Sequence, residues 1–531
     1  EGRAWSRLMV GAVACVGWWG CSSEAGVGPT PERMPPGAGP PSMESPTPEP
    51  PPPPDPWVLP PRCTHGPEDV IAEGTMVVLC GTPEADELTA GAGDDVVNGW
   101  GGDDRLAGGA GNDLYVVRPG GDVVIDDAAG AYDRLWVVGV PPAEIAIETE
   151  GDDVVVTRVP ASASPPLRVT IRGAGAIEHI EVEDASRDRF DDLDFGLYWL
   201  GPDGAREKDI PSVAHPYFDP TRPSFVYVHG WQSGTTAGRQ REGLAEFAEG
   251  AAEGPDLDFV ARWRGAGFNV GVFYWNQLAD EGEVKDAEAK IWTTDGPRAM
   301  RFRRVDESYD TVAGLPPVAR SLRNAWLHAH LGAVSLDPPP AHRVAGHSLG
   351  NQLAVAAVGE IHDAVDDGRV SAALAPRRVA LLDPFWSKGD KGYLGDTTPH
   401  QAVTAITAEL FARGLSFELY RSTPLDLGFV GDGSDAIDAY VCRVDHEADY
   451  FGLFQLVQKH FAAVWLYLWS LDGPPPEDDQ GRSVCSAASD PAALRVAAQG
   501  DVRWQQVTGE NTQTPFDDGY EPRTKRLPPS P

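Results

Sequence analysis

Basic residues are scarce in this chain of 531 residues, where 43 Lys and Arg stand against 80 Asp and Glu. The formal net charge of −37 argues against nucleic acid or an anionic membrane face as a partner, because like charges repel over a Debye length. The charge suggests cation binding instead. The length allows two or three domains, and the hydrophobic content of 41% is ordinary for a soluble protein.

The apolar run near the N-terminus is too short to span a membrane. It extends from Leu8 to Gly20, whereas a bilayer core requires roughly 20 apolar residues. Because Arg3 and Arg7 precede it, the pattern predicts an export signal over residues 1–21. The step from Gly20 to Cys21 resembles the end of a bacterial lipoprotein signal, which implies that a lipidated cysteine attaches the exported protein to the cell surface or outer membrane. Ordinary cleavage, which would leave a secreted protein, is the alternative.

Cysteine is rare as well, with six residues, of which two belong to the predicted signal. The other four are an even number in an exported chain, where thiols tend to pair. Of the three connectivities that four cysteines allow, we expect the one that joins Cys63 with Cys80 and Cys442 with Cys485.

Residues 22–62 form a proline-rich linker, with sixteen prolines between Pro29 and Pro61. This composition favours extended polyproline II over a packed core, with a reach of roughly 3.1 Å per residue. The composition is compatible with two interpretations of this segment, a stiff spacer and a disordered tether.

From Gly81 to Val116 the sequence repeats every nine residues through four units. The sixth position of each unit is an aspartate: Asp86, Asp95, Asp104 and Asp113. The eighth position is always apolar: Leu88, Val97, Leu106 and Tyr115. This pattern resembles the calcium-binding RTX or haemolysin-type repeat, and the resemblance implies a parallel β-roll that binds Ca²⁺.

Two nonapeptides make one coil of such a roll, so Asp86 should stack on Asp104 and Asp95 on Asp113. Each pair is expected to clamp one Ca²⁺, an ion that prefers six or more hard oxygen ligands. The first unit has Pro83 where a glycine is expected, which weakens the site of Asp86 and Asp104.

A second motif is Gly-x-Ser-x-Gly over residues 346–350, which follows a β-branched apolar approach and precedes helix-forming residues 352–358. The pattern predicts a strand, a sharp turn and a helix. In this nucleophile elbow the glycines allow the tight turn and the serine hydroxyl is exposed above the sheet. Ser348 is therefore the predicted nucleophile.

Upstream of this motif, the predicted buried strand 225–228 ends in His229-Gly230-Trp231. This sequence resembles the His-Gly loop of lipases and esterases in the α/β-hydrolase family. The resemblance implies that the backbone N–H groups of Trp231 and Leu349 form the oxyanion hole.

The acid and the base of a catalytic triad follow in the chain. Asp383 ends the predicted strand 378–382, and Leu-Asp-Pro at this point resembles the catalytic acid of lipases. Asp426, after the next predicted strand, is the alternative acid. His460 resembles the family histidine, which lies on a loop just before the last helix, and His446 in a loop that looks solvated is the alternative base.

The predicted architecture is multidomain. A β-roll and β-rich calcium-binding region over residues 63–200 precedes an α/β-hydrolase domain over 201–475 and a C-terminal extension over 476–531. The hydrolase domain should contain a doubly wound, mostly parallel sheet. Within it, residues 279–318 are polar and lack strand character, which suits a cap or a surface insertion.

The resemblances together imply an exported serine hydrolase of the lipase or esterase type. It would act on carboxylic esters, with an ester or lipid as substrate, through Ser348, Asp383 and His460. Calcium is the expected cofactor, and nucleic acid is not an expected partner. The alternative is a calcium-stiffened surface or adhesion protein whose hydrolase-like domain is not catalytic.

Overall fold

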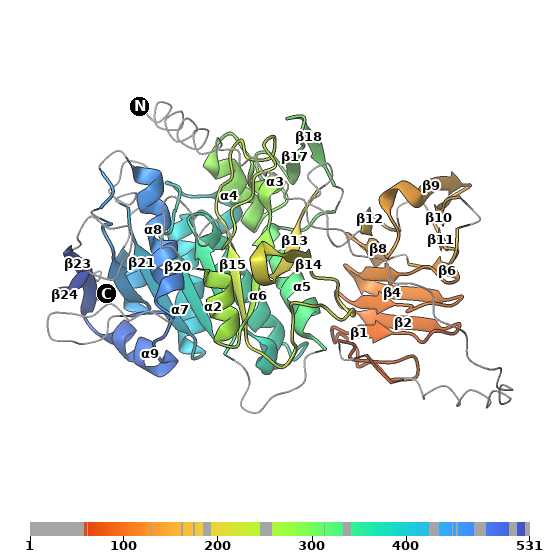
Figure 1. Cartoon of the computed structure of the whole chain (residues 1–531), viewed down its shortest axis with the longest axis horizontal. Coiled ribbons are helices and arrows are strands. Elements are labelled where there is room, and N and C mark those ends of the chain that lie inside the picture. The colour runs from red at the N-terminus through yellow and green to blue at the C-terminus, as the bar shows by residue number, and fades with distance from the viewer. Residues whose placement is uncertain are drawn as a thin grey trace, which may run out of the picture. The chain divides into compact units, whose positions relative to one another are not determined.

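The computed structural model describes residues 58–60, 62–127, 129–160, 163–173, 176–183, 193–244, 258–312, 314–332, 341–423, 435–448, 450–452, 455–471, 485–508 and 518–525 (Figure 1). The predicted signal, the lipidation candidate Cys21, most of the linker and the alternative acid Asp426 lie outside these residues. From Leu59 onward the chain forms one compact unit. Among the described residues, no helix combines the length and the apolar character needed to cross a membrane.

The repeat region begins with two sheets of short strands. One sheet is entirely parallel and has the order β1 (Val78–Cys80), β3 (Val96–Asn98), β5 (Leu114–Val117), β8 (Arg134–Val138) and β12 (His179–Glu183). The other has the order β2 (Glu87–Ala92), β4 (Arg105–Gly111), β6 (Asp122–Ile125), β11 (Arg168–Ile171), β10 (Asp153–Arg158) and β9 (Ile145–Glu150), with β7 (Ala129–Gly130) paired to β4. Its first four strands are parallel, whereas β10 and β9 are antiparallel to their neighbours.

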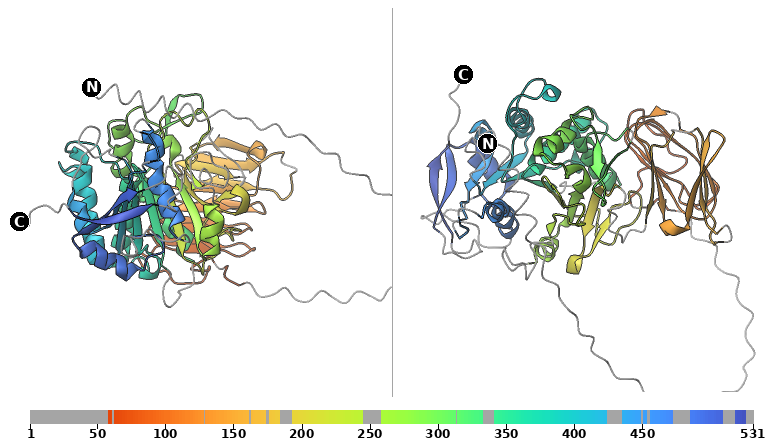
Figure 2. Two further views of the ribbon diagram at one scale, coloured as in Figure 1. Left: turned by 60° about the vertical axis from the view of Figure 1, so that its left-hand side comes forward. Right: turned by 90° about the horizontal axis from the view of Figure 1, so that it is seen from above.

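The core of the repeat region lies between these two layers of strands, which Figure 2 shows in orange. The predicted offset of two nonapeptides is present, because Leu88 pairs with Leu106 and Val97 with Tyr115. All four of these eighth-position side chains are buried in one cluster. The fixed apolar position therefore supplies the core, as the nine-residue period predicts.

The second part of the chain contains a mixed sheet of ten strands. Its order is β14 (Arg206–Lys208), β13 (Gly196–Leu200), β16 (Asn269–Tyr274), β15 (Ser224–Val228), β19 (Arg343–His347), β20 (Arg378–Leu382), β21 (Ser416–Arg421), β22 (Cys442–Asp445), β23 (Val502–Thr508) and β24 (Gly519–Thr524). Strands β16 to β23 in this order are parallel, and the pairs at both edges are antiparallel. A mostly parallel arrangement agrees with the prediction.

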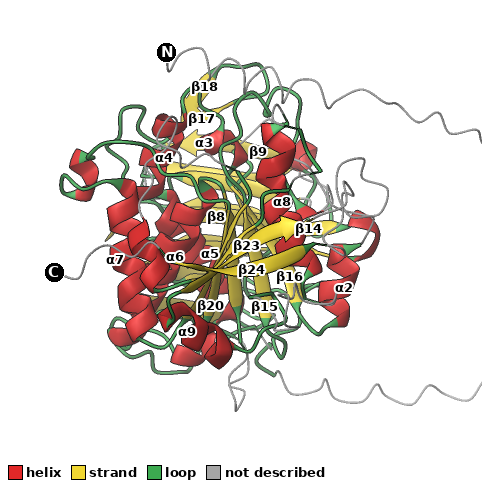
Figure 3. Ribbon diagram, turned by 90° about the vertical axis from the view of Figure 1, so that its left-hand side faces the viewer, coloured by secondary structure: helices red, strands yellow, loops and turns green. Residues whose placement is uncertain are grey.

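Helices cover both faces of this sheet (Figure 3). One apolar cluster joins the sheet to α4 (Val284–Trp292), α5 (Val318–His330), α6 (Gly350–Asp366) and α7 (Pro399–Ala412). The cluster on the opposite face contains residues of α2 (Phe259–Gly265) and α8 (Leu456–Trp469). The short α3 (Asn276–Ala279) follows β16, and α9 (Pro491–Gln499) contributes one residue to each cluster. Both faces of the sheet are thus buried, which accounts for its continuous apolar strands.

The sheet contains strands from outside residues 201–475, the segment in which the sequence predicted it. β23 and β24 come from the predicted C-terminal extension, and β13 begins at Gly196, inside the predicted calcium-binding region. The prediction that residues 279–318 lack strands was wrong, because β17 (Arg301–Arg303) and β18 (Tyr309–Thr311) pair there as an antiparallel hairpin. Strands of three residues, half of which are charged, carry little apolar alternation, so the sequence pattern missed them.

Both predicted disulfides are present. Cys63 bonds to Cys80 beside β1, and Cys442 at the start of β22 bonds to Cys485. The second bond ties the C-terminal segment, which carries α9, β23 and β24, to the sheet. The prediction of both pairs from cysteine parity and position is confirmed.

Candidate functional site

The tight turn predicted around Ser348 connects β19 to α6. Ser348 has a φ of 55°, a conformation that costs a non-glycine residue energy and is held here by its surroundings. Its backbone N–H donates to the carbonyl oxygen of Leu382 at 3.0 Å. A Cβ on Gly346 would lie 2.4 Å from the Gly350 carbonyl oxygen, and one on Gly350 would lie 2.4 Å from that of Val228. Both glycines are therefore required by close backbone contacts.

Asp383 and His460 are in direct contact. The His460 Nδ1 lies 2.5 Å from the Asp383 Oδ2, and the carboxylate is buried directly after β20. The same carboxylate accepts the backbone N–H groups of Ser422 and Thr423, at 3.0 and 3.2 Å, and the Thr423 hydroxyl at 2.5 Å. Asp383 is thus held in one orientation towards the imidazole.

The electrostatic environment suits an ionised acid and a neutral base. Burial alone would raise the pKa of Asp383, but His460 and the Thr423 hydroxyl together hold that pKa below its usual range. Burial lowers the pKa of His460, and the neighbouring His347 lowers it further although Asp383 opposes both effects. A neutral imidazole oriented by a carboxylate can accept a proton.

Ser348 lies at the same edge of the sheet as this pair. His347 of β19 pairs with Leu382 of β20, so Ser348 and Asp383 follow neighbouring parallel strands. The ring of His347 lies 4.4 Å from that of His460 between their centroids. Ser348 itself is half-buried, and its hydroxyl makes no hydrogen bond within the described residues.

Two backbone donors lie next to Ser348. A Cβ on Gly230 would be 2.8 Å from the Ser348 Cβ and 3.2 Å from its Oγ, so the loop after β15 passes directly against the serine. Within the described part of the chain, neither the N–H of Trp231 nor that of Leu349 donates to a protein acceptor. Unpaired donors beside the predicted nucleophile are what an oxyanion hole would require.

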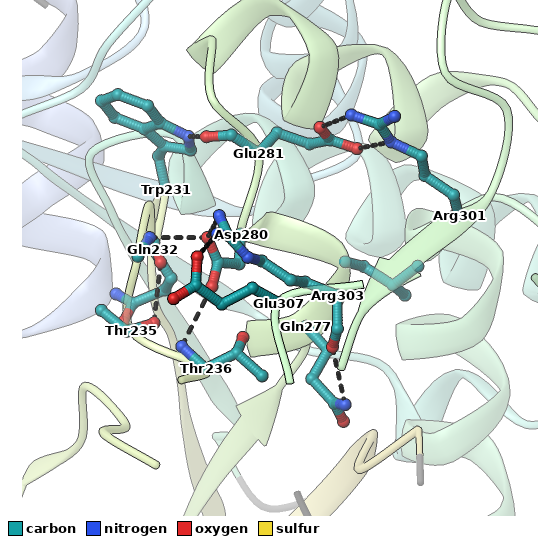
Figure 4. Close-up of polar contacts among 12 residues, drawn as sticks. Trp231, Gln232, Thr235, Thr236, Gln277, Asp280, Glu281, Arg301, Arg303 and Glu307 are labelled. Carbon is teal, nitrogen blue, oxygen red and sulfur yellow. Dashed lines mark hydrogen bonds and ion pairs between the residues drawn. The ribbon is translucent and has the colours of Figure 1, made fainter. Parts of the chain in front are cut away.

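The loop that carries Trp231 is held by the segment after β16 (Figure 4). The Trp231 indole N–H donates to the Glu281 carbonyl oxygen at 2.7 Å. The Asp280 carboxylate accepts the backbone N–H groups of Gly234 and Thr236, at 2.6 and 3.0 Å, and is itself paired with Arg303 of β17. Residues 279–318 therefore do more than form a surface insertion, because Asp280 and Glu281 hold the loop of Trp231 through hydrogen bonds.

The predictions for the base differ from the structure in two respects. His460 lies within the first half of α8, not on a loop before it, and α9 follows α8 in the chain. The alternative base His446 is fully buried, and its ring nitrogens contact the hydroxyl groups of Tyr520 and Tyr450 at 2.8 and 2.9 Å. The prediction of a solvated setting for His446 was wrong, because its side chain is fully buried. This burial lowers the pKa of His446 to about 3.

The predicted aspartates of the repeats stack in the expected pairs. The Asp104 Oδ1 accepts the backbone N–H of Asp86 at 3.0 Å, and the Asp113 Oδ1 accepts that of Asp95 at 2.8 Å. Asp86 differs from the other three because its Oδ2 already accepts the backbone N–H and the hydroxyl of Thr82. The first unit is thus the least suited to a cation, as its irregular sequence predicts.

One oxygen of each remaining carboxylate has no partner. The Oδ2 atoms of Asp95, Asp104 and Asp113 are buried and accept no hydrogen bond within the described residues. A Cβ on Gly99 would lie 2.2 Å from the Asp104 Oδ2, and one on Gly108 would lie equally close to the Asp113 Oδ2. The glycines therefore keep space open beside oxygens that lack a partner.

A third carboxylate group lies at the end of these stacks. Ligand oxygens of Asp113, Asp127 and Asp133 all lie within 4.8 Å of one another, and all three residues are buried. The Asp133 Oδ1 accepts the backbone N–H of Asp113 at 2.7 Å, so Asp133 continues the stack of Asp95 and Asp113. Asp127 and Asp133 were not among the predicted ligands, because a two-residue insertion breaks the nine-residue phase; the structure adds them as candidate ligands. The signal for Asp133 is the apolar Leu135 two positions later, as in every regular unit.

Comparison with known proteins identifies the repeats. Residues 81–115 match the RTX calcium-binding nonapeptide repeat in four copies. No curated protein matches the chain. The chain therefore carries calcium-binding RTX repeats, and the unpartnered buried oxygens of Asp95, Asp104 and Asp113 fit that ion, because Ca²⁺ takes carboxylate and backbone oxygens.

We predict that the stability of the calcium-free protein falls as the pH rises. Burial raises the pKa of Asp95, Asp104 and Asp133 to about 7 and that of Asp113 to about 8, well above the ordinary value of an aspartate. A carboxyl whose folded pKa is raised stabilises the fold at low pH and loses this contribution as the pH passes its folded pKa. The melting temperature of calcium-stripped protein should therefore fall as the pH rises from the ordinary aspartate value of 3.8 to about 8, the highest of these folded values. A melting temperature that rises over this range would contradict the prediction.

Proposed function

We propose that the chain is an exported serine hydrolase that acts on carboxylic esters. The observation that carries the proposal is the contact of 2.5 Å between His460 and the buried Asp383, one strand away from a serine held at a φ of 55°. A buried carboxylate that orients a neutral histidine near a serine hydroxyl has a recurring chemical use, the activation of that hydroxyl.

The architecture supports an α/β-hydrolase of the lipase or esterase type. The serine follows a central parallel strand and precedes a helix, the loop after β15 lies against it, and the order Ser348, Asp383, His460 is the order of that family. Fold alone does not establish an activity, so the proposal rests on the site.

The chemistry follows from the positions of these groups. His460 accepts the proton of the Ser348 hydroxyl as the oxygen attacks the acyl carbon, and the carbonyl oxygen of the ester becomes an oxyanion that accepts hydrogen bonds from the backbone N–H groups of Trp231 and Leu349. His460 then donates the proton to the leaving alcohol. Water, activated in turn by His460, releases the acid and restores Ser348. Asp383 stays ionised and stabilises the imidazolium.

The repeats and the disulfides support an exported protein. Disulfides persist in oxidising compartments outside the cytosol, and both are built into the fold. Calcium, which these repeats bind, would stabilise the repeat region by neutralising its carboxylates. Membrane attachment through Cys21 stays a prediction from the sequence.

The experiment that tests the proposal is labelling with a fluorophosphonate probe. The full chain with calcium should be labelled on one serine, and the variant Ser348→Ala should not be labelled although it folds. Absence of labelling in the folded wild type would favour the alternative, a calcium-stiffened surface or adhesion protein. Labelling of Ser348→Ala to the wild-type extent would place the nucleophile elsewhere.

A further inference from the structure

A second histidine and carboxylate pair lies behind the proposed triad. His347, the residue before Ser348, is 1% exposed, and its Nδ1 lies 2.8 Å from the Oε1 of Glu242, which is 6% exposed. Glu242 also accepts the Tyr227 hydroxyl at 2.5 Å and the Gln232 side-chain amide at 2.8 Å. The carboxylate is therefore fixed from three sides, and the orientation of the His347 ring is fixed with it.

The other nitrogen of His347 faces the proposed base. The His347 Nε2 lies 3.3 Å from the backbone carbonyl oxygen of His460, and the two rings are 4.4 Å apart between centroids. A carbonyl oxygen only accepts hydrogen bonds, so the Nε2 must carry a proton to bind it. His347 thus connects the turn of Ser348 to the first half of α8.

Both ring nitrogens of His347 therefore face acceptors. Both oxygens of Glu242 accept hydrogen bonds from neutral donors, Oε1 from the Tyr227 hydroxyl and Oε2 from the Gln232 amide, as the oxygens of an ionised carboxylate do. A neutral imidazole carries one N–H, whereas an imidazolium carries two. Only the doubly protonated ring satisfies the Glu242 carboxylate and the His460 carbonyl oxygen together.

We propose that Glu242 holds His347 as an imidazolium, and that this cation positions His460 for proton transfer with Ser348. The inference rests on the proposed function, and it makes His347 and Glu242 positioning residues that do not touch substrate. Its physical content is twofold. The hydrogen bond fixes the backbone of His460, and a fixed positive charge near the base disfavours a second charge on the base before reaction.

The charged and titratable groups around His347 are few. Glu242 is the carboxylate that contacts it, and Asp383 lies beyond His460. His229, at the end of β15, interacts with both Glu242 and His347, and burial lowers its pKa, so it adds no charge. Removal of the charge on His347 thus takes away a positive charge beside His460 and leaves the carboxylates of Glu242 and Asp383, the second of which also interacts with Arg421.

The charge on His347 can be tested without any assay of activity. In ¹⁵N-histidine spectra of the full chain with calcium at neutral pH, we expect a signal from an imidazole with both nitrogens protonated that is absent from His347→Gln. The same signal should revert to a neutral ring in Glu242→Gln, which removes the anion and keeps a hydrogen-bonding side chain of the same shape. A neutral ring for His347 in the wild type would overturn the inference.

The positioning role is tested by the pH profile. In His347→Gln we expect kcat for p-nitrophenyl butyrate to fall about 10-fold to 100-fold, as for a misplaced catalytic group, with a KM change below about threefold. The acid limb of kcat/KM should move to higher pH, because protonated His460 is no longer opposed by a cation. His362→Gln is the matched control, since His362 is a histidine of α6 that contacts the Pro376 carbonyl oxygen instead.

The outcomes separate this inference from the proposed function. An active wild type whose acid limb is unchanged in His347→Gln would overturn the positioning role and leave the hydrolase proposal intact. A folded wild type with neither ester hydrolysis nor fluorophosphonate labelling would overturn both. A shift of the limb in His362→Gln as well would show a general change of the fold and would also count against the inference.

Discussion

Asp383→Asn is expected to lower kcat by about 10⁴, the scale seen when a triad histidine is held in the wrong tautomer. In the structure the Asp383 carboxylate accepts hydrogen bonds from His460, from the backbone N–H groups of Ser422 and Thr423, and from the Thr423 hydroxyl. An asparagine keeps the size of the side chain, but its amide nitrogen cannot accept the His460 N–H. Far-UV circular dichroism and KM should stay near wild type, and initial rates of p-nitrophenyl butyrate hydrolysis measure the loss.

Asp426→Asn is the matched control, because Asp426 is the other aspartate that the sequence offers as the acid. It should leave kcat close to wild type if Asp383 orients His460. A severe loss in Asp426→Asn, with Asp383→Asn near wild type, would reverse the assignment. Mild defects in both single variants and a severe defect in the double variant would mean that either carboxylate can reach the histidine.

Short-range patterns carried most of what the sequence could predict. The nonapeptide phase placed Leu88 on Leu106 and Asp95 on Asp113, because identical repeats must stack with a fixed offset. The turn at Ser348 could be predicted for a similar reason, since two glycines and a strand-to-helix change are encoded within a few residues. Cysteine parity, together with the positions of the four residues in the chain, was sufficient for the disulfides.

Long-range contacts were out of reach. Glu242 lies 105 residues before His347, in a segment with no motif, and only the fold brings its carboxylate to the histidine. Asp127 and Asp133 escaped because an insertion breaks the repeat phase, although the stack continues in space. The place of the strands β23 and β24 in the sheet depends on pairing with β22 and not on a local pattern.

Removal of calcium is expected to unfold the repeat region and to leave the ten-stranded sheet folded. At pH 8 the buried carboxylates of Asp95, Asp104 and Asp133 would be ionised, with pKa values of about 7, and no cation would balance them. The sheet has its own apolar clusters on both faces and needs the ion less. At a free calcium concentration of about 100 times the Kd, each site would add about 2.7 kcal/mol to the free energy of unfolding.

Hydrogen exchange with mass spectrometry of the full chain localises this effect. In chelator, amides of β2 to β8 should exchange much faster, while those of β15, β19 and β20 should change little. Magnesium at the same concentration should not restore protection, because it demands a smaller and more rigid octahedral site. Equal protection of β2 to β8 with and without calcium would contradict the prediction.

Asp113→Asn should separate the two roles of the buried carboxylate, repulsion without the ion and ligation with it. Asp113 belongs both to the stack with Asp95 and to the cluster with Asp127 and Asp133, so its charge is close to those of three other carboxylates. In chelator at pH 8, the neutral amide should raise the free energy of unfolding relative to wild type. With calcium the order should invert, because a tenfold loss of affinity costs about 1.4 kcal/mol.

The control for this variant is Asp152→Asn, an exposed aspartate of the same region outside the three carboxylate groups. It should leave the unfolding free energy close to wild type under both conditions, since exposed charges contribute little. Only a ligand-binding carboxylate should change the sign of its effect when calcium is added. If Asp113→Asn is destabilised equally in chelator and in calcium, Asp113 supports packing alone, and the buried oxygen without a partner is not a calcium ligand.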